Sequence, residues 1–411
     1  MFNIQNFGAV GDAKTLNTGA IQAAINKCSE EGGGTVIFPK GIFISGTLRL
    51  KGNITYLFER GAVLKGSDDF SDYCDNGFNH IELGKTISLL WAVNEQNIRI
   101  TGDGTIDLSA RSFLSQDSVI LYGDGIDIDI LTEEQKGECP VHIKKRLTQP
   151  IFFDSCADVT VDSIKIIDSP CWTLTFSRSE RISVHHININ NSLSVGNSDG
   201  IHFSACKDAI VSDSFFSCGD DCVAITCITA EGENDISERI TVSRCHMRSR
   251  SAGVRIGHYK GKVRDILISD LVITDSNRGL AIFSGTEGFV KNVKAHDIIM
   301  QTRIAAGGWW GKGEAVVICA AKSEGHIQNI DIRGITARCE AGILIAGSDG
   351  NVEDITLKDI SLTILKGSNS ELFGGDLDFR PNLFIAGGAK SAQPIYVQGV
   401  KNFYSENVKI Q

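Results

Sequence analysis

The stretch "SFFSCGDDCVAI" at residues 214–225 places two adjacent carboxylates inside an otherwise apolar segment. Asp220 and Asp221 follow Gly219, and the neighbouring sequence offers no basic side chain to balance them. Like charges side by side repel, so an arrangement of this kind needs a reason. Aspartate after glycine is also a favoured turn residue. The pair alone therefore fits a structural turn at least as well as a catalytic site.

The segments around this pair repeat. Each combines apolar–any–apolar, two mostly polar residues, and apolar–any–apolar or small, which predicts two short strands joined by a bend. Consecutive repeats start 23 to 37 residues apart. A unit of this size cannot bury its apolar side alone, whereas a stack of such units shares one interior. The repeats start at Val159, Ile182, Ala209, Ile240, Ile266, Val293, Ile330 and Ile355.

A right-handed parallel β-helix, an all-β solenoid, accounts best for this pattern. Leucine-rich repeats need a leucine and asparagine ladder that the chain lacks, alternation with period two excludes helical repeats, and a sandwich would not keep the spacing. We expect one domain over residues 1–411, with a cap region at 1–34, coils over 35–411, and loop insertions near 109–148 and 367–392. A helix over residues 17–28 would cap the open end of the solenoid.

Stacking of the coils predicts which residues lie next to Asp220 and Asp221. The eleventh and twelfth residues after the Ala209 start are Asp220 and Asp221, and the same count from the Ile266 start reaches Arg278. The preceding coil carries "VGNSDGIHF", with Asp199 at the equivalent turn. We therefore expect Asp199, Asp220 and Asp221 to meet on one face of adjacent coils, roughly 5 Å apart along the axis.

Three clustered carboxylates suit acid–base cleavage of a glycosidic bond. One carboxylic acid protonates the leaving oxygen, while another carboxylate takes a proton from the attacking water. Mutual repulsion raises the pKa of one of the three, so that it keeps its proton for this role.

Composition limits the other functions. The 411-residue chain has a net charge of −10 and no sustained basic run, which argues against nucleic-acid and anionic-membrane partners. No apolar stretch is long enough to span a membrane, and no signal-like segment opens the sequence. We expect a cytoplasmic protein whose 12 scattered cysteines are reduced. Cys218 and Cys222 lack the partners of a zinc set, so we predict neither metal nor cofactor.

The sequence resembles glycoside hydrolase family 28, the polygalacturonase-like enzymes that degrade pectin and cell-wall polysaccharides. The likeness runs from "FGAVGDAKTLNTGAIQAAI" and "GGGTVIFPKGIF" through "LFERGAVLKGS" and "ITGDGTIDL". The family's Asn-Thr-Asp and Gly-Asp-Asp motifs match Asn197-Ser198-Asp199 and Gly219-Asp220-Asp221. The resemblance implies a parallel β-helix and an inverting hydrolase. In it Asp220 would be the general acid, and Asp199 and Asp221 would activate water.

Two departures from the family pattern concern the substrate. The family's Gly-His-Gly falls on Ser251-Ala252-Gly253, and its Arg-Ile-Lys, which holds a galacturonate carboxylate, falls on Ala281-Ile282-Phe283. Losing these cations removes charge-assisted hydrogen bonds to an anionic sugar. Rhamnogalacturonan-type members also lack the histidine. We therefore expect a pectin-type substrate other than plain homogalacturonan.

Other residues are candidates for substrate binding, each with a structural alternative. Arg255 interrupts an apolar alternation and could simply point outward, and His258 lies in a glycine-flanked loop where a solvated histidine is common. Adjacent tryptophans usually divide between core and surface. The candidates are Asn197, Arg255, His258, Arg278, Phe283, whose ring would suit the methyl edge of a deoxy sugar, and Trp310.

Other functions of the same fold stay open at this stage. A β-helix lyase usually needs a Lys or Arg base and often calcium, and an epimerase needs a base on each face of the sugar ring. A non-catalytic carbohydrate-binding solenoid would not need three aligned aspartates. In every case the expected partner is a carbohydrate, and the two insertions leave room for a homo-oligomer.

Overall fold

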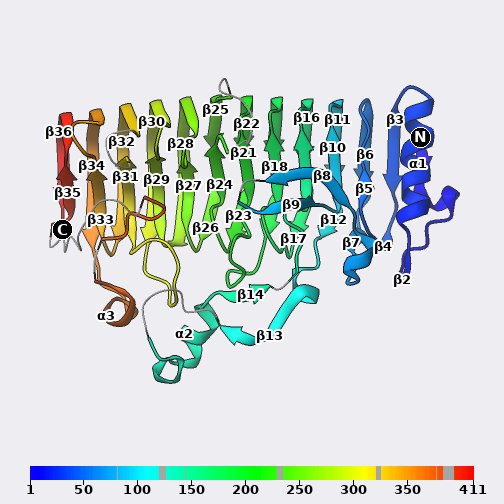
Figure 1. Ribbon diagram of the computed structural model, residues 1–411, viewed down its shortest axis with the longest axis horizontal. Coiled ribbons are helices and arrows are strands. Elements are labelled where there is room, and N and C mark those ends of the chain that lie inside the picture. Colours follow the sequence, from blue (N-terminus) through cyan, green and yellow to red (C-terminus); the bar gives the residue numbers. More distant parts are fainter. Residues whose placement is uncertain are drawn as a thin grey trace.

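The computed structural model describes residues 1–80, 82–119, 126–143, 145–228, 235–320, 325–375, 377–382 and 393–411. The chain winds as a right-handed parallel β-helix, as the repeats predicted. Its two termini lie at opposite ends of the long axis (Figure 1).

The predicted repeat starts form one ladder. Strand pairing sets Val159 beside Ile182 and continues coil by coil to Ile355, with all eight starts in register. The bends of the coils coincide with the two polar residues in the middle of each repeat. The fourth residue after every start has a left-handed backbone, a conformation that Asp, Asn and Gly tolerate best. These residues are Ser163, His186, Asp213, Arg244, Asp270, Asp297, Gly334 and Asp359.

One sheet, here called the floor sheet, carries the candidate site. It has eleven parallel strands, which follow one another along the axis. In chain order they are β5 (Leu48–Arg49), β10 (Leu90–Val93), β15 (Ile151–Asp154), β18 (Leu174–Ser177), β21 (Ile201–Ser204), β24 (Val223–Thr226), β27 (Ala252–Ile256), β29 (Arg278–Ser284), β31 (Glu314–Ala320), β33 (Gly342–Ala346) and β35 (Ile395–Gln398).

The repeats themselves build a second sheet of 21 strands. Early coils contribute two short strands each, and later coils one long strand that contains the bend. The short strands are β1 (Phe2–Asn3), β2 (Asp12–Leu16), β3 (Gly34–Phe38), β4 (Gly41–Ser45), β6 (Ile54–Phe58), β7 (Ala62–Gly66), β11 (Gln96–Gly102), β12 (Thr105–Asp107), β16 (Ala157–Asp162), β17 (Lys165–Ile167), β19 (Glu180–His185), β20 (Asn188–Asn190), β22 (Lys207–Ser212), β23 (Phe215–Cys218), β25 (Ser237–Ser243) and β26 (His246–Ser249). The long strands are β28 (Lys262–Ser276), β30 (Phe289–Thr302), β32 (His326–Cys339), β34 (Val352–Ile364) and β36 (Val400–Ile410).

The predicted cap is helix α1 (Thr18–Glu30) at the N-terminal end of the axis (Figure 1). Its buried face consists of Ile21, Ala24, Ile25 and Cys28, the face that the sequence predicted. All twelve cysteines are free thiols, and most fill the core as small apolar groups. No described helix has the length and apolar character needed to cross a membrane.

Several insertions leave the coils in the described part of the chain. The hairpin of β8 (Asp75–His80) and β9 (Gly84–Ile87) was not anticipated. The insertion expected near 109–148 contains β13 (Leu114–Val119), β14 (Val141–Ile143) and the short helix α2 (Glu133–Glu138). The one expected near 367–392 begins with α3 (Ser370–Phe373), while its part over 383–392 lies outside the described residues.

Candidate active site

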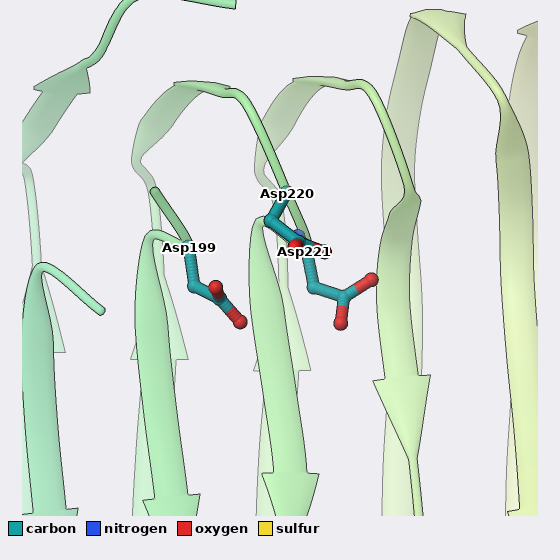
Figure 2. A group of neighbouring side chains, drawn as sticks. All are labelled: Asp199, Asp220 and Asp221. Atoms are coloured by element: carbon teal, nitrogen blue, oxygen red, sulfur yellow. The ribbon is translucent and has the colours of Figure 1, made fainter. Parts of the chain in front are cut away.

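The three aspartates meet as predicted. Asp199 lies two residues before β21, and Asp221 lies two residues before β24, the next strand of the floor sheet. Figure 2 shows Asp199 on one turn and Asp220 and Asp221 on the next. One oxygen of each carboxylate lies within 4.8 Å of the others. Stacking of the coils therefore gathers three acidic groups from two turns.

Gly219 allows the two turns to approach this closely. A Cβ at this position would lie 2.1 Å from the carbonyl oxygen of Val195 and 2.6 Å from Oγ of Ser198. The Gly219 N–H instead donates to Ser198 Oγ at 3.0 Å. The turn with Asp220 is therefore tied to the turn with Asp199 through backbone that only glycine accommodates.

Asp221 is held by two donors. The backbone N–H of Ala252 donates to its Oδ1 at 3.0 Å, and Arg255 Nε donates to its Oδ2. A second guanidinium nitrogen of Arg255 lies 4.0 Å from Asp199 Oδ2. Arg255 is 7% exposed, so its side chain turns into the site and not outward. A buried charge-assisted pair of this kind balances part of the negative charge of the cluster.

Asp220 faces the cleft and is partly exposed. Its Oδ2 accepts the backbone N–H of Asn197 at 3.2 Å, and its Oδ1 accepts that of Asp221 at 3.0 Å. Partial burial, followed by the charge of Asp221, raises the pKa of Asp220 to about 7. Near neutral pH this carboxyl group keeps a proton for part of the time, as a general acid must.

Asp199 is the most enclosed of the three, at 1% exposure. Burial, followed by the charges of Asp220 and Asp221, raises its pKa well above the ordinary value. Among the described residues neither of its oxygens has a hydrogen-bond donor. The nearby His202 does not compensate, because burial lowers its pKa well below the usual range and keeps it neutral. Both Asp199 oxygens therefore keep their acceptor positions free of donors from the described part of the chain.

A cleft of about 690 Å³ surrounds the cluster, and several predicted residues line it. His258 is 3% exposed and shares a hydrogen bond of 2.8 Å with Glu82. The two tryptophans divide as expected. Trp309 is buried and donates to the Glu138 carbonyl at 2.9 Å, whereas Trp310 is 37% exposed. The predicted residues that line the cleft, besides the aspartates, are Asn197, Arg255, His258 and Trp310.

The structure does not bring Arg278 and Phe283 to the cleft. Arg278 stacks in register with Ala252, as counted, but it is 1% exposed and donates to the carbonyls of Asp378 and Arg380 at 2.8 Å. Phe283 is fully buried beneath the Arg278 guanidinium. Insertion residues cover both side chains, so the expectation that they contact a sugar is not supported.

Sequence reasoning missed other lining residues. Trp172 lies two residues before β18, the same ladder position as Asp199 and Asp221, so the stacking count could have found it. Glu82 and Arg380 come from insertions, where no repeat fixes their place. Arg250 precedes Ser251 in the stack and is 3% exposed.

Three carboxylates this close also resemble the oxygen ligands of a hard cation. In this structure Arg255 already lies against two of them, Asp221 and Asp199. The positive charge of the site therefore comes from the chain itself, and the cluster alone does not define a metal site.

A parallel β-helix with three clustered carboxylates over one sheet is the arrangement that the sequence analysis predicted for a glycoside hydrolase. The family model described as "Glycosyl hydrolases family 28" matches residues 28–372, and the chain belongs to this family.

The relatives agree with this assignment. The chain is 27% identical over 322 residues to a "Probable polygalacturonase" of Vitis vinifera, covering 73% of this chain and 60% of that protein. It is 25% identical over 384 residues to an "Exo-poly-alpha-D-galacturonosidase" of Dickeya chrysanthemi, covering 83% and 63%. The match thus spans less than two thirds of the length of these relatives. Among solved structures, an exopolygalacturonase from Thermotoga maritima shares the fold, with a TM-score of 0.66, 24% identity, and coverage of 89% and 87%.

Proposed function

We propose that this protein hydrolyses a glycosidic bond in a pectin-type polysaccharide or oligosaccharide. The observation that carries the proposal is the convergence of Asp199, Asp220 and Asp221 in one cleft, with Arg255 on Asp221 and no donor among the described residues on Asp199. The three carboxylates are thereby made unequal, as acid–base catalysis requires.

Each carboxylate has a role in this proposal. Asp220, with its raised pKa and its exposure to the cleft, protonates the leaving oxygen. Asp199 and Asp221 bind the attacking water and take its proton. Asp199, whose pKa is raised, takes this proton in its ionised form. Arg255 neutralises part of the charge that builds up when Asp220 gives away its proton.

The stereochemical outcome needs its own measurement. Simple inverting pairs of carboxylates lie about 6.5–9.5 Å apart. The nearest oxygens here lie within 4.8 Å. Inversion is therefore proposed from the family likeness, with two aspartates sharing one water, and not from the spacing. Proton NMR of the first product formed distinguishes the anomers, and a retained configuration would refute this part of the proposal.

The proposed substrate is a neutral or mixed linkage, such as one in rhamnogalacturonan, in preference to plain homogalacturonan. Ala252 and Ala281, where the family's cations would stand, lie in an apolar cluster with Phe379. The arginines that do line the cleft each have a carboxylate partner: Arg255 pairs with Asp221, Arg250 with Asp275, and Arg380 with Asp378. A polyuronate would have to compete for these cations.

The test is release of reducing sugar from rhamnogalacturonan fragments beside polygalacturonic acid, at matched ionic strength. We expect faster turnover of the rhamnogalacturonan fragments. Faster turnover of polygalacturonic acid would mean that the paired arginines bind uronates after all. Ultraviolet absorbance of an unsaturated uronate would show a lyase, and release of no sugar from any substrate would refute hydrolysis.

The relatives include proteins named for exo and for endo action, so the family does not decide between cleavage at chain ends and within the chain. We also propose a cytoplasmic location, which the free state of all twelve cysteines supports. Cell fractionation tests this location.

A further inference from the structure

The floor sheet is covered on the N-terminal side of the aspartates. Figure 1 shows β8 and β9 crossing the coils instead of running with them. The hairpin packs on the floor through two ring contacts: Phe78 meets Phe152 edge-on at 5.6 Å, and His80 meets Trp172 edge-on at 4.6 Å. Beyond these rings, the bond between Glu82 and His258 fixes the turn of the hairpin beside the cleft.

A second chamber of about 340 Å³ lies at this cover. The hairpin lines it with Phe78 and His80, and the floor sheet lines it with Phe152. Trp172 lines both this chamber and the cleft around the aspartates, so the two spaces adjoin. The chamber also holds the ion pair of Asp154 and Arg178, 2.7 Å apart, which supplies polar groups for sugar hydroxyls.

A second cover lies on the C-terminal side. Phe379, from the insertion over 377–382, packs on the floor residues Ala252, Ala281 and Phe283. Asn382 fastens the segment by donating to the carbonyl oxygens of Ser284 and Cys319, at 3.2 and 2.8 Å.

The neighbouring loop is tied to the same segment. The Gly311 N–H donates to Asp378 Oδ2 at 2.8 Å, and Arg380 donates to the Trp309 carbonyl at 2.8 Å. Trp310 and Tyr259 remain partly exposed and line the cleft, at 37% and 50% exposure.

We infer that the enzyme acts at the ends of pectic chains or on short oligosaccharides, and not on internal bonds of a polymer. The inference rests on the proposed hydrolase function and adds its mode of action. A polysaccharide cleaved in its middle must leave the site in both directions along the floor. Here the β8–β9 hairpin and the 377–382 segment lie across those two directions. The terminal sugar enters past Trp310 and Tyr259 and reaches the chamber beside Trp172.

The experiment follows viscosity and product length during hydrolysis of polygalacturonic acid and of rhamnogalacturonan. We expect one short product from the first time point, with little loss of viscosity. A ladder of long products with a rapid fall in viscosity would overturn the inference and leave the proposed hydrolysis intact. Release of no sugar from either polymer, or from oligosaccharides derived from them, would overturn both.

A loosened hairpin gives a second test. Phe78→Ala combined with Glu82→Ala removes the ring contact with Phe152 and the bond to His258, and it alters none of the three aspartates. We expect this variant to release longer products early in the reaction. The control is Lys85→Gln, which removes only an exposed ion pair to Asp75 in the same hairpin and should keep the wild-type pattern. Equal product patterns in all three proteins, each shown to be folded by its thermal transition, would contradict the role of the hairpin.

Discussion

Replacement of the proposed general acid, Asp220→Asn, separates catalysis from stability. The side chain keeps its size but loses both its proton and its charge. Loss of a general acid typically lowers the rate by about 10²–10⁴-fold. Because Asp220 is partly exposed and lies outside the apolar core, we expect the fold to be retained.

The effect on stability follows from the pKa. The pKa of Asp220 is raised from an ordinary value of 3.8 to about 7, so the folded protein binds this proton more tightly than the unfolded chain does. Its stability therefore falls as the pH rises from about 4 to about 7, and the loss is complete above 7. The difference corresponds to on the order of 4 kcal/mol as an upper limit. Asparagine escapes this cost, although its amide satisfies only one of the two N–H donors, a loss of about 1 kcal/mol.

We therefore expect Asp220→Asn to be inactive, close to wild type in stability at pH 4, and more stable at pH 8. The assay combines reducing-sugar release with thermal melts of both proteins across this pH range. Ser217→Ala, on the strand before the turn, is a matched control without a charge change. Wild-type rates in the variant would show that Asp220 is a turn residue. A stability difference that does not change with pH would show that its carboxyl group is not perturbed.

Four further predictions concern the same site. Arg255→Gln should lower kcat and move the pH–rate profile, because it leaves Asp221 buried without its cation; an unchanged profile would mean that Arg255 only packs. Gly219→Ala should reduce stability strongly, because its Cβ would meet the Val195 carbonyl at 2.1 Å, and urea unfolding measures the loss. Trp310→Ala should raise KM more than it lowers kcat, since loss of an aromatic ring on which a sugar stacks weakens binding. A KM equal to wild type would exclude the contact. Wild-type activity should fall above pH 7 as Asp220 loses its proton, and a rate still rising at pH 8 would contradict its role as the acid.

The sequence predicted the coils and the aspartates for the same physical reason. Apolar residues such as Ile182 and Ile240 must share one interior, which fixes the register of each coil on the next. Once the register is fixed, a residue at a known offset has a known neighbour. Asp199 and Asp221 are close because the strands that follow them pair directly, Ile201 with Val223.

Positions outside the ladder could not be reached in this way. Glu82 and Phe379 come from insertions that cross or cover the coils, and nothing in a repeat spacing says where such a segment folds back. The direction of a side chain was also undetermined. Arg278 occupies the counted position but turns beneath the insertion, because the carbonyls of Asp378 and Arg380 accept its N–H groups there.

The register also relates Arg255 to the missing cations. Arg255 pairs directly with Ala281, the position that corresponds to the family's arginine, so the charge stands one coil earlier in this chain. From this position the guanidinium of Arg255 contacts Asp221 and Asp199, which lie on the preceding coils of the floor sheet. In the proposed function, an arginine paired with these carboxylates supports their chemistry and is not available to hold a uronate. Phe379 packs in one apolar cluster with Ala281, so an apolar side chain covers this position. Under the proposed function, this displacement of one charge is the reason for both the retained acid–base site and the proposed preference for a substrate other than homogalacturonan.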